Sequence, residues 1–333
     1  MQDKELPPPK ERALRPKLLW AAKLLITILI LAYIFKTFRN EQKGIEDVGK
    51  VLRGAFTNNN LPLLLLTLVL MPVNWALESL KWQKLAGKIS QITFKEAFRG
   101  TLTGLAVGVA VPAQLGDTMG RIAALKSANR LEAIGAALLS NGIQFMISVI
   151  GGAIGWFQLH DRLQLSERTQ LLISCLLVTI ILLAVVFAIF RKPLTRWHPS
   201  RPVLVKLHHY IRVIGTYSNA ELAWSLWFGS LRYLVFLTQF VLALSLFELA
   251  VPFFQLFAAV TLVFLVKTLI PAINVLGDLG LREFTALVVF ASYNLPPERI
   301  IAATFLVWII NVFGPILVGI LLIWKYKWRE FKW

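Results

Sequence analysis

Two polar segments interrupt apolar stretches of the sequence, and they carry the residue types most able to do chemistry. The first, VPAQLGDTMGR, covers 111–121, and the second, IPAINVLGDLGLRE, covers 270–283. Each contains Pro-Ala, then Gly-Asp, then an arginine four residues after the aspartate. Proline cannot donate to the helical hydrogen-bond ladder, and glycine permits unusual dihedral angles. Each segment therefore predicts a break in a helix at membrane depth.

A helix that begins after such a break offers free amide groups and the positive end of its dipole, which together attract anions. Arg121 and Arg282, about one turn further on, would add a full positive charge each. Asp117 and Asp278 fit two roles, because they could cap the helix and pair with these arginines or could line a polar cavity. Ionisable groups at membrane depth usually face a bundle interior or a wet cavity, so we favour an anion site and keep the capping alternative open.

Other ionisable residues also lie inside apolar stretches. Arg232 sits too deep in its stretch to reach the membrane surface, and Lys267 comes just before the second break; we expect both to line a cavity. Glu78 lies four residues after Asn74 and three before Lys81, and its position fits internal pairing and cavity lining equally well. Charged groups that face a shared cavity could bind an anionic lipid headgroup.

The elements that would position these residues are membrane helices. The chain has 333 residues, of which 57% are hydrophobic and only 16% charged, so we predict an all-α polytopic transmembrane bundle. About six full spans are expected; their approximate ranges are Leu18 to Phe35, Leu61 to Leu80, Ala133 to Leu159, Leu171 to Phe190, Leu222 to Phe247 and Ile300 to Trp324. The interrupted regions, about 94–125 and 253–293, are expected to form two re-entrant hairpins arranged as an inverted repeat. Small residues in TLTGLAVGVA, IGGAIGW and FGPILVG would permit close helix approach.

The Lys and Arg residues that give the chain its net charge of +17 lie at span ends. These basic residues do not alternate with base-stacking aromatic residues. Their pattern therefore excludes nucleic acid as the partner and favours anionic lipids of the inner leaflet. Most flanking Lys and Arg lie on one side if each hairpin enters and leaves on the same side, which puts both termini in the cytoplasm. We thus expect a basic tail over 1–17, one membrane domain over 18–325 and a second basic tail over 326–333.

The sequence has one cysteine and four histidines without a ligand pattern, so we predict no metal, no cofactor and no catalytic residue. Two alternatives to lipid transport stay open. One is a membrane-embedded transferase that acts on a lipid-linked substrate, with Asp117, Asp278 or Glu283 as base or metal ligand. The other is an accessory subunit of a lipid or glycan enzyme. The oligomeric state is also open.

Three motifs carry a family resemblance. LESLKWQKL ends an apolar helix with Lys81 and Trp82, the first break reads P-x-x-x-G-D-x-x-x-R, and the second reads G-x-x-G-x-R-E. Over about 55–325 the chain resembles the lysylphosphatidylglycerol synthase transmembrane region family. Where members often carry a glutamate-arginine pair after the first break, this chain has Ser140 and Asn141.

The resemblance implies a flippase-like protein of the bacterial cytoplasmic membrane that moves an anionic, aminoacylated or polyprenyl-linked lipid between leaflets. Because the soluble aminoacyl-transfer domain of bifunctional members does not appear in the sequence, we expect no synthase activity from this chain alone. Residues matched to the two break motifs join the cavity candidates in one predicted substrate-binding set: Pro112, Gly116, Asp117, Arg121, Arg232, Lys267, Gly277, Asp278, Gly280, Arg282 and Glu283.

Overall fold

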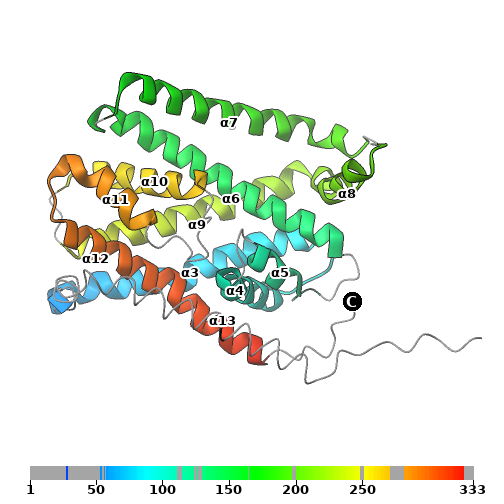
Figure 1. The fold of residues 1–333 in the computed structure, drawn as a ribbon. Coiled ribbons are helices and arrows are strands. Elements are labelled where there is room, and N and C mark those ends of the chain that lie inside the picture. Colours follow the sequence, from blue (N-terminus) through cyan, green and yellow to red (C-terminus); the bar gives the residue numbers. More distant parts are fainter. Residues whose placement is uncertain are drawn as a thin grey trace, which may run out of the picture.

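The structure is a computed structural model, shown in Figure 1. It describes residues 28, 53–54, 56, 58–110, 115–123, 125, 130–163, 165–196, 200–247, 251–270 and 281–325. These residues form helices joined by turns, with no strand among them, which confirms the all-α prediction. The expected first span, Leu18 to Phe35, lies outside the described residues apart from Ile28, and both predicted tails, 1–17 and 326–333, lie outside them entirely.

The α-helices follow one another along the chain. They are α3 (Leu61–Ala86), α4 (Phe94–Ala110), α5 (Leu115–Ala123), α6 (Arg130–Leu159), α7 (Glu167–Leu194), α8 (Pro202–Thr216), α9 (Asn219–Ser245), α10 (Phe253–Leu269), α11 (Leu281–Phe290), α12 (Pro297–Trp308) and α13 (Gly314–Lys325). Short 3-10 turns occupy Asn58–Asn60, His160–Arg162 and Ala291–Tyr293. Five described stretches are long and apolar enough to cross a membrane: α3, α6, α7, α9 and the path from α12 through α13. The polytopic prediction is therefore confirmed for this part of the chain.

The last of these spans is less regular than predicted. The sequence predicts a continuous helix over 300–324, but a π-helical turn at Ile309–Phe313 separates α12 from α13. Pro315 follows this turn and has no amide hydrogen to donate, and its ring cannot fit against a regular preceding turn. A widened turn accommodates the proline without ending the helix.

Each interrupted region contains a longer helix followed by a short one, as predicted. In the first region the 17-residue α4 precedes the 9-residue α5, and in the second the 17-residue α10 precedes the 10-residue α11. About 20 residues are needed to cross the hydrocarbon core, so neither α5 nor α11 is long enough to span it alone. The breaks themselves, 111–114 and 271–280, lie outside the described residues.

The two hairpins lie at opposite ends of the bundle (Figure 1). At one end a cluster of buried apolar residues includes Leu85 of α3, Ala97 of α4 and Ala136 of α6. A larger cluster, at the other end, joins Leu64 of α3 to residues of α9, α10 and α11, among them Phe290. Leu64 and Leu85 lie near opposite ends of α3, so the two hairpins pack at opposite ends of this helix.

Glycines set the closest helix contacts, as the small-residue segments predict. In α6, a Cβ on Gly152 would meet the Leu265 side chain of α10, and a Cβ on Gly151 would lie 2.5 Å from the Tyr233 hydroxyl oxygen. Gly319 of α13 packs on α4, where its Cβ would lie 2.5 Å from the Leu102 carbonyl oxygen. By contrast, only 6% of the apolar central segment of α7 is buried inside the protein, so α7 lies on the outside of the bundle.

Candidate functional site

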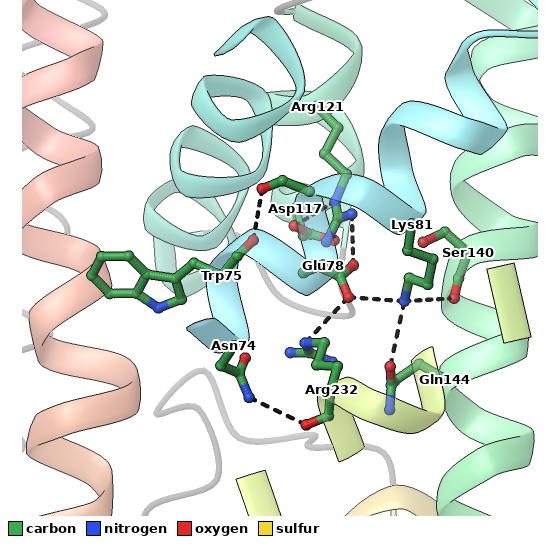
Figure 2. Close-up of polar contacts among 10 residues, drawn as sticks. Asn74, Trp75, Glu78, Lys81, Asp117, Arg121, Ser140, Gln144 and Arg232 are labelled. Atoms are coloured by element: carbon green, nitrogen blue, oxygen red, sulfur yellow. Dashed lines mark hydrogen bonds and ion pairs between the residues drawn. The ribbon is translucent and has the colours of Figure 1, made fainter. Parts of the chain in front are cut away.

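Glu78 on α3 is the centre of a buried cluster of charged side chains (Figure 2). Its Oε1 atom lies 2.8 Å from Nη1 of Arg121, and its Oε2 atom lies 2.9 Å from Nζ of Lys81 and 3.2 Å from Nε of Arg232. The Glu78 side chain is only 4% exposed. One carboxylate therefore holds three cations from three different helices. We call Glu78, Lys81, Asp117, Arg121 and Arg232 the charged cluster.

Arg121 reaches Glu78 because α5 packs very closely on α4. A Cβ on Gly104 of α4 would lie 2.7 Å from Oδ1 of Asp117, and a Cβ on Gly120 of α5 would lie 2.5 Å from the Gly104 Cα. Within α5, Nε of Arg121 donates to both carboxylate oxygens of Asp117 at 2.9 Å. The predicted pairing across four residues is thus present. The pair with Asp117 is not the only contact of Arg121, because its guanidinium also reaches Glu78 on α3.

Lys81 and Trp82 complete the α3 side of the charged cluster. The Lys81 ammonium donates to the Ser140 carbonyl oxygen at 3.3 Å and to Oε1 of Gln144 at 3.4 Å, both on α6. The Trp82 ring is fully buried and lies 5.7 Å from the Arg121 guanidinium carbon, within the range of a cation–π contact. The Lys-Trp pair of the LESLKWQKL motif therefore joins α3 to α5 and α6.

Arg232 approaches from α9, and its backbone carbonyl accepts a 3.4 Å hydrogen bond from the Asn74 side chain of α3. Its side chain is 24% exposed, compared with 15% for Asp117 and at most 4% for the other members of the charged cluster. Arg232 is therefore the member most accessible from outside the protein.

The charges of the cluster do not cancel. Among the residues that the structure describes, three basic side chains face two carboxylates in the cluster, which leaves one formal positive charge in excess. Buried charge without a counter-charge is costly at membrane depth, and such sites mark ligand or ion pathways. The arrangement is suited to binding an anion. Among the described residues, no group of three or more His, Cys, Asp or Glu side chains is placed to hold a metal ion.

The structure brings together three of the residues that the sequence singles out for the site: Asp117, Arg121 and Arg232. Gly116, a fourth, packs against the Val107 and Gly108 backbone and so supports the same hairpin. Four predicted site residues lie outside the described residues: Pro112, Gly277, Asp278 and Gly280.

Three further predicted residues belong to the second hairpin. Arg282 and Glu283 are buried side chains of α11, with exposed fractions of 2% and 7%. The Lys267 ammonium on α10 lies 5.8 Å from the centre of the Phe236 ring. The basic residues in contact with Glu78 are Lys81, Arg121 and Arg232. Of these, Arg232 is supplied by α9.

Sequence reasoning did not place Glu78 and Lys81 in the predicted site. Their spacing of three residues indicates a local ion pair, which the structure contains at 2.9 Å. What the spacing does not show is that two arginines distant in sequence reach the same carboxylate. The available signal was the depth of Glu78 in an apolar helix, which pairing with Lys81 alone would also explain.

Comparison with known proteins identifies the family of the chain. A search of curated protein sequences found no match to this chain. A family model described as the lysylphosphatidylglycerol synthase TM region matches residues 20–319, nearly the whole chain, including every member of the charged cluster. The chain therefore belongs to the lysylphosphatidylglycerol synthase transmembrane region family and is an integral membrane protein with a lipid-related function.

Proposed function

We propose that this protein moves a lipid with an anionic headgroup between the two leaflets, and that the charged cluster binds that headgroup. The observation that carries the proposal is the excess positive charge around Glu78, in a site whose most exposed member is Arg232. A phosphate in the headgroup would supply the missing negative charge. Arginine suits this role because its planar guanidinium donates two parallel hydrogen bonds to a phosphate.

The arrangement of the hairpins supports movement of the lipid as well as binding. Two broken-helix units lie at opposite ends of the bundle (Figure 1), and we interpret them as an inverted repeat. Transporters built from such repeats place their substrate sites where discontinuous helices meet. The charged cluster lies between the first hairpin and spans α3, α6 and α9. A movement of the hairpin would therefore change the position of Arg121 in the headgroup site.

A leaflet assay tests the proposal. Purified protein is reconstituted into vesicles that carry a trace of fluorescent NBD-phosphatidylglycerol, and dithionite then quenches the probe that reaches the outer leaflet. We expect native protein to make the inner-leaflet probe accessible. Arg232→Ala should slow this by about tenfold or more, because one charge-assisted contact is lost at the most accessible member of the charged cluster.

Arg168→Ala is the matched control, since Arg168 is an exposed arginine at the start of α7 and away from the charged cluster. It should move the probe at the native rate. Movement no faster with native protein than in protein-free vesicles would contradict the proposed function. Equal rates for Arg232→Ala and native protein would exclude the charged cluster as the headgroup site.

A further inference from the structure

The three cations around Glu78 are not equally dependent on it. Arg121 is also held by Asp117, through two hydrogen bonds of 2.9 Å. Lys81 is also held by the Ser140 carbonyl oxygen and the Gln144 side chain. For Arg232, Glu78 is the one acidic partner among the described residues. The Arg232–Glu78 contact is also the longest of the three ion pairs of Glu78, at 3.2 Å.

Glu78 itself does not depend on Arg232 for a counter-charge. If Arg232 turned away, Glu78 would keep Arg121 on Oε1 and Lys81 on Oε2. No buried carboxylate would be left without a counter-charge, which is the costly outcome when most buried ion pairs break. Arg232 is also the most exposed member of the charged cluster, so an entering molecule can reach it. The Arg232–Glu78 pair is thus the one contact that can exchange.

We propose that Glu78 is an internal competitor for the anionic headgroup: it occupies Arg232 while the site is empty and takes it back when the lipid leaves. The idea rests on the proposed function, because it assigns the headgroup to the charged cluster. Glu78 is then a positioning residue that acts on the lipid through Arg232.

Competition of this kind sets how tightly the site holds the lipid. The Glu78 carboxylate is tethered next to Arg232, so it competes at a high effective concentration wherever the lipid comes from. A transport site must bind strongly enough to load and weakly enough to release. By offering Arg232 an alternative partner, Glu78 weakens lipid binding and speeds release.

The test measures lipid affinity separately from lipid movement. Binding of NBD-phosphatidylglycerol to the full chain in detergent is followed by energy transfer from the protein's tryptophans. Glu78→Gln keeps the shape of the side chain and removes its charge, so the Kd should fall by about tenfold, the size of one charge-assisted contact. In vesicles the same variant should saturate at lower probe density and show a lower maximal rate, because release becomes slow.

Two further variants keep the result interpretable. Glu78→Asp keeps the charge but shortens the reach to Arg232, so its Kd should lie between the native and Glu78→Gln values, and it decides the matter if Glu78→Gln does not fold. Glu167→Gln makes the same change at an exposed site on α7 and should leave the Kd unchanged.

A Kd for Glu78→Gln and Glu78→Asp that is equal to or higher than the native value would overturn the competition. That result is distinct from failure of the proposed function. Tighter binding by Glu78→Gln together with no lipid movement by the native protein would remove the flippase assignment and leave the competition standing.

Discussion

At the scale of single residues, the charged cluster contains two local pairs that meet at the Glu78 carboxylate. Glu78 and Lys81 are three residues apart on α3, and Asp117 and Arg121 are four apart on α5. Each pair alone would be an ordinary helix-stabilising contact. The contact of 2.8 Å between Arg121 and Glu78 joins them into one buried network. Arg121 therefore carries more of the stability of the protein than its own helix requires.

Replacing Arg121 by alanine should cost more stability than replacing Asp117 by asparagine. Arg121→Ala removes a cation from two carboxylates in a buried site, and we expect a loss of about 3–5 kcal/mol in the free energy of unfolding. Asp117→Asn leaves Arg121 paired with Glu78, so we expect about 1–3 kcal/mol. Intrinsic tryptophan fluorescence during heating or denaturant unfolding in detergent measures both. Equal losses for the two variants would show that the link between Arg121 and Glu78 adds nothing.

At the scale of elements, the close packing of α5 on α4 brings Arg121 to the site. Gly104 of α4 and Gly120 of α5 face each other, and neither leaves room for a side chain. The short α5 does not cross the bundle, so its position depends on this contact with α4 and on the charged cluster. The glycines thus act on the site by bringing a helix close to its neighbours.

Gly120→Ala should destabilise the first hairpin. Its new methyl group would lie 2.5 Å from the Gly104 Cα and 2.7 Å from the Gly104 nitrogen, so the backbone itself must shift. Overpacking of this kind costs about 1–3 kcal/mol. The control is Gly142→Ala on α6, where a Cβ meets nothing within 4 Å and better helix propensity should add up to about 1 kcal/mol. Thermal unfolding that ranks Gly142→Ala below Gly120→Ala would contradict the packing.

At the scale of the whole molecule, the two hairpins lie at opposite ends of the bundle and one helical path touches both. α12 packs against α9 and α11, whereas α13 packs against α4. The π-helical turn at Ile309–Phe313 lies between these two halves of the path (Figure 1). The path formed by α12 and α13 therefore connects the two hairpins physically.

Opposite ends of the bundle should face opposite sides of the membrane. In a Cys175→Ser background, Ser90→Cys places a thiol between α3 and α4, and Ser292→Cys places one between α11 and α12. The distribution of basic residues favours a cytoplasmic α3–α4 turn. A membrane-impermeant maleimide should label the Ser292→Cys variant in intact cells and the Ser90→Cys variant only after permeabilisation. Labelling of both from the same side would contradict the opposed hairpins, and the reverse pattern would invert the orientation.

Properties that depend on neighbouring residues along the chain could be predicted before the fold was known. Apolar runs of sufficient length predicted α3, α6, α7 and α9, and each interrupted region contains the short helix that was predicted, α5 or α11. Spacings of three and four residues predicted the ion pairs within α3 and α5. Hydrophobic length, backbone geometry and helix periodicity depend only on residues close together in the chain, so these features can be predicted from the sequence.

The charges that share a site could not be predicted in this way, because they meet through the packing of distant helices. Glu78, Arg121 and Arg232 come from three helices, and no periodicity links residues so far apart in the chain. Their meeting depends on how closely α5 and α9 pack against α3, which side-chain volumes across the whole bundle determine. The same packing made α9 the source of the third cation. A buried carboxylate stays charged only where enough cations converge on it, and that convergence is a property of the fold.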